Sequence, residues 1–341
     1  MPVLIDRGPA GGSIRNTSER LLELGLVNNM PDAALESTER QFLELLQAAA
    51  QDMPVRLRLY SLPDVPRTPA GREHLSSGYR AIDELWNSRL DGLIVTGTEP
   101  RAPVLSDEPY WGSLTRVMAW AQENTASTVW SCLAAHAAVL HLDGIDRHPH
   151  EEKLSGVFDC AKASDHPLLA GLPARIRIPH SRCNGLHDEA LASRGYTILT
   201  RSTDVGVDAF VKQSGSLFVF FQGHPEYDER ALLREYRRDL GRYLRHERET
   251  YPAMPQGYFD EVAAGALAGF GERARLQRNE RLLDSFPTAF VERRLRPLDR
   301  APVSRLYRNW LSYLRAQKRP TSRASASPRR TDAPQPAEGV S

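Results

Sequence analysis

Two residues that could take part in covalent chemistry, a cysteine and a histidine, each follow a β-prone run of the sequence. Cys132 comes just after residues 127–130 and directly before residues 133–140, whose alanines and leucines favour a helix. A thiol at such a strand-to-helix turn faces the free N–H groups of the first helical turn, which favour the thiolate and can stabilise an oxyanion. This segment alone fits a buried structural cysteine equally well.

His224 and Glu226 follow a second apolar run, residues 218–221. Active sites of open α/β sheets gather outside the carboxyl ends of the strands, so both residues are expected at the same sheet edge as Cys132. A histidine that is oriented by a carboxylate beside a cysteine is a standard activated nucleophile. Alone, His224 would be an ordinary core or surface histidine, and the presence of Cys132 weakens that interpretation. The pattern therefore predicts a Cys–His–Glu triad.

A metal site is not predicted. Cys132 and His136 have a Cys-x₃-His spacing, but no second pair with zinc-like spacing exists, because Cys160 and Cys183 stand alone. His136 is expected to face neighbouring helices.

Strand-like runs alternate with helical ones along the chain. The clearest strand, residues 93–95, is a continuous apolar run that ends in a Gly turn, which is typical of a central parallel strand. This alternation predicts an α/β fold with a mainly parallel sheet. Residues 63–80 and 147–150 are expected to be loops. The other expected strands are 24–28, 55–60, 127–130, 175–178, 197–200, 208–212 and 217–221. Helices are expected at 110–122, at 133–140, from a cap at Asp32 or Ser37 through Leu46, and after Glu226, with an apolar stripe from Leu233 to Leu244.

Composition excludes several classes of protein. The 341 residues are 41% hydrophobic and 26% charged, with a formal net charge of +1. This is globular composition, and the charge balance gives no case for binding nucleic acid or an anionic membrane. No apolar run reaches the ~18 residues that a membrane span needs. Three cysteines are too few for a disulfide framework, so a cytoplasmic protein with reduced thiols is expected. Four segments are predicted: an arm (1–20), a main domain (21–250), a helical C-terminal extension (251–317) and a disordered tail (318–341).

Seven short motifs together resemble the homoserine O-acyltransferases of the MetA type, which themselves look like class I glutamine amidotransferases. Each motif alone is weak, but all seven occur in the family's order and approximate spacing. The resemblance implies a class I glutamine amidotransferase-like (flavodoxin-like) three-layer α/β fold, with a central, mainly parallel sheet and a helical C-terminal extension. The motifs occupy residues 29–31, 38–42, 91–97, 110–111, 152–157, 179–182 and 223–228.

The resemblance implies acyl transfer in two half-reactions. Cys132 would attack an acyl-CoA thioester, and the homoserine hydroxyl would then attack the Cys132 acyl-enzyme. His224 would act as general base and acid and Glu226 would orient it. The oxyanion would be held by backbone N–H groups, here those of Leu133 and of Gly97-Thr98. Acyl-CoA is a co-substrate in such enzymes, no cofactor or metal is expected, and relatives are homodimers in methionine biosynthesis.

Three further residues fall on positions that bind substrate in the family: Lys153, Ser181 and Arg238. Periodicity and composition alone describe Lys153 as a solvated ion-pair residue and Arg238 as a solvated arginine. The resemblance instead implies that Arg238 pairs with the carboxylate of the amino-acid substrate, because a guanidinium can bind two oxygens.

The acyl donor depends on a position where the chain departs from the family. Relatives carry Glu there for acetyl donors and Gly for succinyl donors, and this chain has Arg101. Arg101 could pair with the free carboxylate of a succinyl group, which favours succinyl-CoA. The nearby Glu99 would reverse the choice if it lined the pocket instead. Residues 255–300 look like an insertion without a functional interpretation.

Other functions remain open at this stage. An acetyl-CoA donor and serine as acceptor are the near alternatives. A glutaminase shares the triad but usually has Gly two residues after the cysteine, where this chain has Ala134. A non-catalytic binding module is a third class, and the intact triad argues against it.

Overall fold

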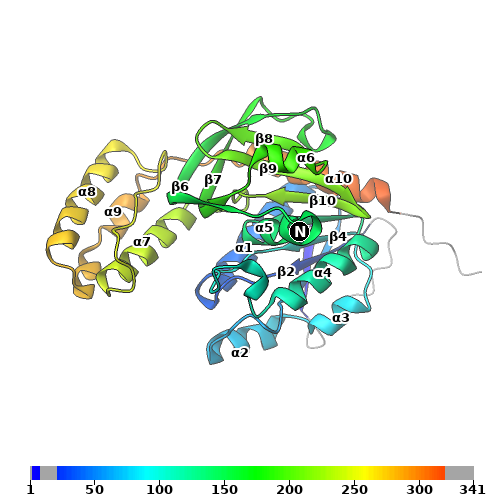
Figure 1. Cartoon of the computed structure of the whole chain (residues 1–341), viewed down its shortest axis with the longest axis horizontal. Coiled ribbons are helices and arrows are strands. Elements are labelled where there is room, and N and C mark those ends of the chain that lie inside the picture. Colours follow the sequence, from blue (N-terminus) through cyan, green and yellow to red (C-terminus); the bar gives the residue numbers. More distant parts are fainter. Residues whose placement is uncertain (1, 8–20, 319–341) are drawn as a thin grey trace, which may run out of the picture.

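One sheet of ten strands forms the centre of the structure, a computed structural model that describes residues 2–7 and 21–318. Its strand order is β1-β3-β2-β4-β5-β10-β9-β8-β6-β7 (Figure 1). The strands are β1 (Val3–Asp6), β2 (Leu22–Val27), β3 (Val55–Tyr60), β4 (Gly92–Val95), β5 (Ser127–Ser131), β6 (His148–Lys162), β7 (Arg175–Gly185), β8 (Thr197–Ser202), β9 (Gly206–Ser214) and β10 (Ser216–Phe221). The α-helices are α1 (Asp32–Ala50), α2 (Pro69–Gly78), α3 (Ile82–Trp86), α4 (Trp111–Asn124), α5 (Leu133–Asp143), α6 (Asp188–Ser193), α7 (Ala231–Leu244), α8 (Glu261–Leu276), α9 (Thr288–Glu292) and α10 (Ala301–Gln317).

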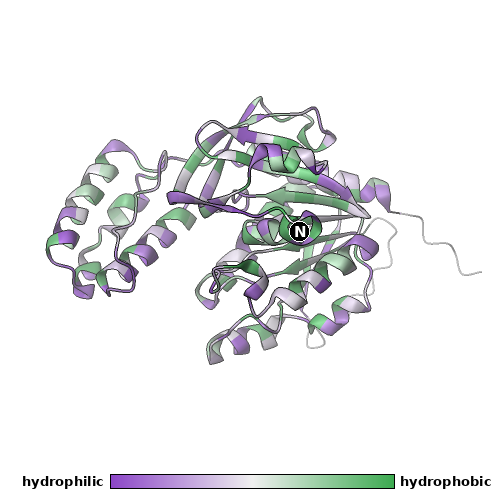
Figure 2. Ribbon diagram, in the orientation of Figure 1, coloured by the Kyte–Doolittle hydropathy of each residue, from purple (hydrophilic) through white to green (hydrophobic). Residues whose placement is uncertain are grey.

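The half of the sheet that carries the cysteine is parallel. Along the sheet, the strands β1, β3, β2, β4, β5 and β10 are parallel to their neighbours. From β10 onward, the pairs β10–β9, β9–β8, β8–β6 and β6–β7 are antiparallel. Every residue of β4 and β10 is buried, and Figure 2 shows the central strands as hydrophobic. Strands buried on both faces are continuous apolar runs, which is why the sequence pattern identifies them. The predicted α/β fold with a mainly parallel central sheet is confirmed.

The prediction of a loop at residues 63–80 is wrong, because α2 lies within it. Thr68 caps this helix: its hydroxyl accepts a hydrogen bond from the N–H of Gly71 at 3.2 Å. Pro69 follows at the first helical position, where its missing N–H costs nothing. The Pro, Gly and Ser residues that suggest a loop are in part the start of a short helix.

The prediction of a loop at residues 147–150 is also wrong, since β6 begins at His148. His148 pairs with Gly185 of β7, and the register shifts between Pro149 and Leu154. Such an irregularity hides the alternation that marks a strand. The first described residues form β1, which extends the parallel edge of the sheet beside β3. The predicted tail, apart from Lys318, and most of the predicted arm lie outside the described residues.

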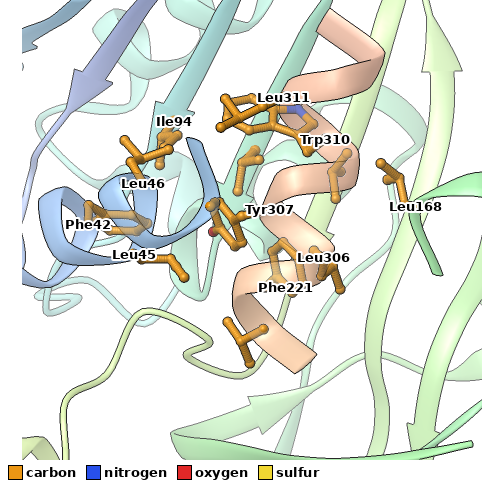
Figure 3. Close-up of a cluster of buried hydrophobic side chains, with 14 of the residues drawn as sticks. Phe42, Leu45, Leu46, Ile94, Leu168, Phe221, Leu306, Tyr307, Trp310 and Leu311 are labelled. Carbon is orange, nitrogen blue, oxygen red and sulfur yellow. The ribbon is translucent and has the colours of Figure 1, made fainter. Parts of the chain in front are cut away.

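The C-terminal helix α10 covers one face of the sheet together with α1. Trp310 Nε1 donates a hydrogen bond to Ser127 Oγ at 2.9 Å, which ties α10 to the first residue of β5, the strand that ends just before Cys132. This helix therefore belongs to the main core and supports the strand that carries Cys132. The side chains in contact, shown in Figure 3, include Phe42, Leu45 and Leu46 from α1 and Tyr307, Trp310 and Leu311 from α10.

Helices α7, α8 and α9 form a lobe beside β6 and β7 (Figure 1) with a hydrophobic cluster of its own. The apolar stripe predicted from Leu233 to Leu244 is buried in α7. Helix α7 therefore buries its apolar side in this lobe, and its polar residues remain available to the sheet edge. Among the described residues, no helix has the length and apolar character of a membrane span.

Candidate active site

Cys132 lies in a sharp turn between β5 and α5. Its backbone angles, φ 53° and ψ −114°, are in a region that residues other than glycine rarely adopt. Backbone hydrogen bonds hold it there: the Cys132 N–H donates to the Phe221 carbonyl at 2.7 Å, and its carbonyl accepts from Ala135 at 3.0 Å. Strained conformations that the surrounding structure over-determines are characteristic of active sites. The turn presents a partly exposed thiol at the carboxyl edge of the sheet.

His224 and Glu226 reach the same place because β10 is the parallel neighbour of β5, with Phe221 paired to Ser131. His224 Nδ1 lies 2.8 Å from Glu226 Oε1, and both side chains are almost fully buried. The His224 ring also stacks on Tyr227 at a centroid distance of 4.1 Å. The carboxylate and the stacked ring fix the plane of the imidazole and leave Nε2 for the thiol.

Electrostatics favour the protonated form of His224. Burial alone would lower the pKa of His224, but charge and hydrogen-bond interactions with Cys132 and Glu226 outweigh it and raise this pKa well above 6.5. The pKa of His136, one helical turn beyond the cysteine, shifts in the opposite direction. Burial lowers the pKa of His136 to about 3, and its Nε2 lies 2.9 Å from Gln222 Oε1. Of the two imidazoles near the thiol, His224 is therefore the one that holds a second proton more readily, and His136 is a neutral group bonded to Gln222.

The backbone positions predicted to hold an oxyanion meet at the same point. A Cβ atom on Gly97 would lie 2.7 Å from Leu133 Cβ and 2.9 Å from Leu133 N, so only glycine allows the turn after β4 to approach this closely. Leu133 opens α5, and an N–H in the first helical turn has no acceptor within the helix. The N–H groups at this junction are therefore placed to stabilise negative charge next to Cys132.

A cavity of about 340 Å³ surrounds these groups, and a larger one of about 1140 Å³ adjoins it. The smaller cavity contains the triad, the turn at Gly97 and Thr98, and all three predicted substrate-binding residues. Arg147, Arg182, Glu235 and Asp239 also line it, although the sequence analysis had assigned them no role. Residues that line both cavities are Glu99, Lys153, Cys183, Asp239, Arg242 and Arg248.

A charged network crosses the cavity between the β6–β7 hairpin and α7. Lys153 Nζ lies 2.7 Å from Asp239 Oδ2 and 3.4 Å from Glu235 Oε2. Glu235 also accepts hydrogen bonds from Ser181 Oγ and from the Tyr227 hydroxyl. Burial would raise the pKa of Glu235, but Lys153 and other positive groups outweigh it and lower this pKa. Glu235 and Asp239 have no predicted role, although their i, i+4 spacing places both carboxylates on one side of α7.

Arg238 stands beside this network. Its Nε and Nη2 atoms bond Asp239 Oδ1 at 3.1 and 3.0 Å, and its side chain is 40% exposed. Those two bonds leave Nη1 for another partner. The structure thus brings Lys153, Ser181 and Arg238 to one cavity from three different elements.

The two residues considered for donor choice are placed differently. Glu99 lines the cavity and forms two hydrogen bonds with Arg242, at 2.6 and 2.8 Å. Arg101 is exposed and is not among the residues that line the smaller cavity. The buried carboxylate of Glu108 accepts the Arg101 N–H at 2.6 Å and fixes the turn in this orientation. The structure therefore gives no contact through which Arg101 would read an acyl group bound to Cys132.

Behind the site lies a cluster of three residues of the types that commonly bind metal ions. The ligand atoms of Cys160, His180 and Asp208 lie within 4.8 Å of one another, and all three residues are buried. Arg182 Nε donates to His180 Nδ1 at 3.3 Å, so the proton of this imidazole lies on Nε2, 3.2 Å from Asp208 Oδ1. His180 is thus already connected to both Arg182 and Asp208. The group is better described as a buried polar network beneath Gly223.

Comparisons with known proteins identify relatives of this chain. The family model described as homoserine O-succinyltransferase matches residues 13–321. A homoserine O-succinyltransferase from Rhodopseudomonas palustris is 48% identical over 303 residues, which cover 89% of this chain and 91% of the relative. One from Bradyrhizobium japonicum is 48% identical over 307 residues, covering 90% and 94%. A solved glutamine amidotransferase from Thermotoga maritima aligns with a TM-score of 0.43 at 13% identity, covering 80% of this chain and 97% of that one.

Proposed function

The chain belongs to the homoserine O-succinyltransferase family, and from that membership we propose that it transfers a succinyl group from succinyl-CoA to the hydroxyl of L-homoserine through a thioester on Cys132. The chain is an acyltransferase by its family. The observation that carries the covalent route is the strained turn that presents Cys132 to His224, which Glu226 orients at 2.8 Å.

In the first half-reaction the Cys132 thiolate attacks the thioester carbonyl of the donor. The new C–S bond places negative charge on the carbonyl oxygen, which the N–H groups at Leu133 and the Gly97 turn stabilise. As the intermediate collapses, the bond to the CoA sulfur breaks, and the proton on His224 goes to the departing thiolate. The products are free CoA and a succinylated Cys132.

In the second half-reaction the homoserine hydroxyl attacks the same carbonyl carbon. His224, now neutral, accepts the hydroxyl proton, and the bond to Cys132 breaks to restore the thiolate and imidazolium pair. Glu226 keeps the imidazole in the orientation that both proton transfers need. Protons and electron pairs balance with the side chains and the two substrates, so acyl-CoA serves as co-substrate and we expect no bound cofactor.

The charged network provides the acceptor subsite. Arg238 offers Nη1 to the homoserine carboxylate, and the carboxylates of Glu235 and Asp239 offer acceptors to its ammonium group. Lys153 holds these two carboxylates in place through its ion pairs. In this subsite the carboxylate and the ammonium group of the amino-acid acceptor are both bound close to the acylated Cys132. The O-acylated product is consistent with the methionine biosynthesis that the family resemblance implies.

A substrate panel tests the proposal. Succinyl-CoA and acetyl-CoA are each combined with homoserine and with serine, and kcat/KM is measured for the four pairs. We expect the highest value for succinyl-CoA with homoserine, and no glutamine hydrolysis. Hydrolysis of glutamine without acyl transfer, or transfer that survives Cys132→Ala, would contradict it.

A further inference from the structure

The smaller cavity contains one cation that differs from the others. Arg147 lines it and, in the part of the chain that the structure describes, has neither a hydrogen bond nor an ion pair. The remaining cations of this cavity all have polar partners. Lys153 pairs with Glu235 and Asp239, Arg182 bonds His180 and Asn184, Arg238 bonds Asp239, Arg242 bonds Glu99, and Arg248 bonds Thr250.

Arg147 is half-buried in the connection between α5 and β6, close to the nucleophile. Burial lowers the pKa of Arg147, and interactions with Tyr110, Glu108, Cys132 and Cys183 partly offset this effect. Because a guanidinium stays charged in proteins, the result is a partly desolvated positive charge without a paired anion. An anion that enters the cavity gains a charge-assisted, two-pronged contact there.

The position of Arg147 indicates which anion this is. Arg147 lines only the smaller cavity, whereas Arg242 and Arg248 also line the larger one. An acyl group bonded to Cys132 Sγ has its far end within that small volume. The acceptor carboxylate already has Arg238, which comes from α7 on the other side of the charged network. Arg147 therefore remains for the end of the acyl chain.

We propose that Arg147 binds the terminal carboxylate of the succinyl group and makes the enzyme selective for dicarboxylic acyl donors. This inference rests on the proposed acyl-CoA reaction and names the residue that selects its donor. An uncharged acyl chain leaves the guanidinium unpaired, and a succinyl chain satisfies it. Arg147 would then have the role that the sequence suggests for Arg101.

Donor selectivity of the full-length enzyme tests this role. Acylation of Cys132 is measured with succinyl-CoA and with butyryl-CoA, which has the same chain length without the carboxylate. Arg147→Gln is expected to lower kcat/KM for succinyl-CoA by about 100-fold and to leave that for butyryl-CoA within about threefold. Arg147→Lys keeps the charge without the two-pronged geometry, so we expect a smaller loss that is again confined to succinyl-CoA.

Arg248→Gln and Arg101→Gln are the matched controls, and both are expected to keep the wild-type donor ratio. Alkylation of Cys132 by iodoacetamide at the wild-type rate shows that the Arg147 variants retain the site. A wild-type preference for butyryl-CoA, or an equal loss for both donors in Arg147→Gln and Arg147→Lys, would overturn the role of Arg147. A wild-type enzyme that neither donor acylates would overturn the proposed function itself.

Discussion

The site has two regions that are built in different ways. The nucleophile region, consisting of Cys132, His224 and Glu226, is held by main-chain geometry at the ends of the neighbouring parallel strands β5 and β10. The charged network of Lys153, Glu235 and Asp239 is held by long side chains from the β6–β7 hairpin and α7. The first region depends on backbone hydrogen bonds and strand pairing, and the second depends on contacts between side chains. We therefore expect changes in the nucleophile region to affect bond making, and changes in the charged network to affect binding of the acceptor.

Removal of the thiol should have the largest effect. Cys132→Ala eliminates the atom that carries the acyl group, and we expect acyl transfer to fall by about 10⁴-fold or more. Steady-state CoA release in the presence of homoserine measures this loss. Thermal unfolding serves as the control, because the strained turn is expected to tolerate alanine. Transfer within tenfold of wild type would show that the nucleophile region does not form the bond.

Glu226→Gln should affect the nucleophile region through the proton on His224. Since Glu226 helps to raise the pKa of His224, its neutral replacement should lower that pKa. The imidazolium is then lost at lower pH, so the alkaline limb of the pH profile of kcat/KM for the acyl donor should shift to lower pH. We also expect kcat to fall by about 100-fold. A pH profile that is unchanged would mean that Glu226 has only a structural role.

Gly97→Ala should disturb the oxyanion position without touching a reacting side chain. The added methyl would lie 2.7 Å from Leu133 Cβ, so the turn must move away from the first N–H of α5. A fall of about 30-fold in kcat is expected, with the KM for homoserine nearly unchanged. Gly112→Ala is the matched control, because a Cβ there meets nothing within 4 Å. Equal kinetics for the two variants would remove the Gly97 turn from the oxyanion site.

A change in the charged network should raise the KM for homoserine, whereas the changes in the nucleophile region lower kcat. Asp239→Asn removes the closest charged partner of Lys153, at 2.7 Å, and a partner of Arg238. We expect the KM for homoserine to rise about tenfold, while Cys132 is acylated at the wild-type rate. Arg245→Gln, an exposed change just beyond the end of α7, is the control. Loss of acylation in Asp239→Asn would show that the two regions are not separable.

The same division decides what the sequence could predict. Cys132 and His224 were placed correctly at one sheet edge because each follows an apolar strand, which is a local signal. Ion-pair partners are not local: nothing near Lys153 in the sequence indicates that Asp239 lies beside it. The position of the Arg101 backbone is a further case, because the carboxylate that holds its N–H belongs to Glu108, seven residues later.

The secondary-structure predictions for α2 and for the start of β6 are wrong for related reasons. The helix α2 was missed because its Pro, Gly and Ser residues favour a loop, although the Thr68 cap and Pro69 were available as signals. The start of β6 was missed because its polar residues pair irregularly with β7. The central strands were found because burial on both faces leaves a continuous apolar run.

The most direct test of the covalent account uses the donor without the acceptor. The enzyme is mixed with succinyl-CoA alone, quenched rapidly, and analysed by mass spectrometry of the intact chain and its peptides. We expect the mass of one succinyl group to be added to Cys132, and one equivalent of CoA to be released, before any homoserine is added. Transfer to homoserine by an enzyme that never shows this adduct, or an adduct on a different residue, would contradict it.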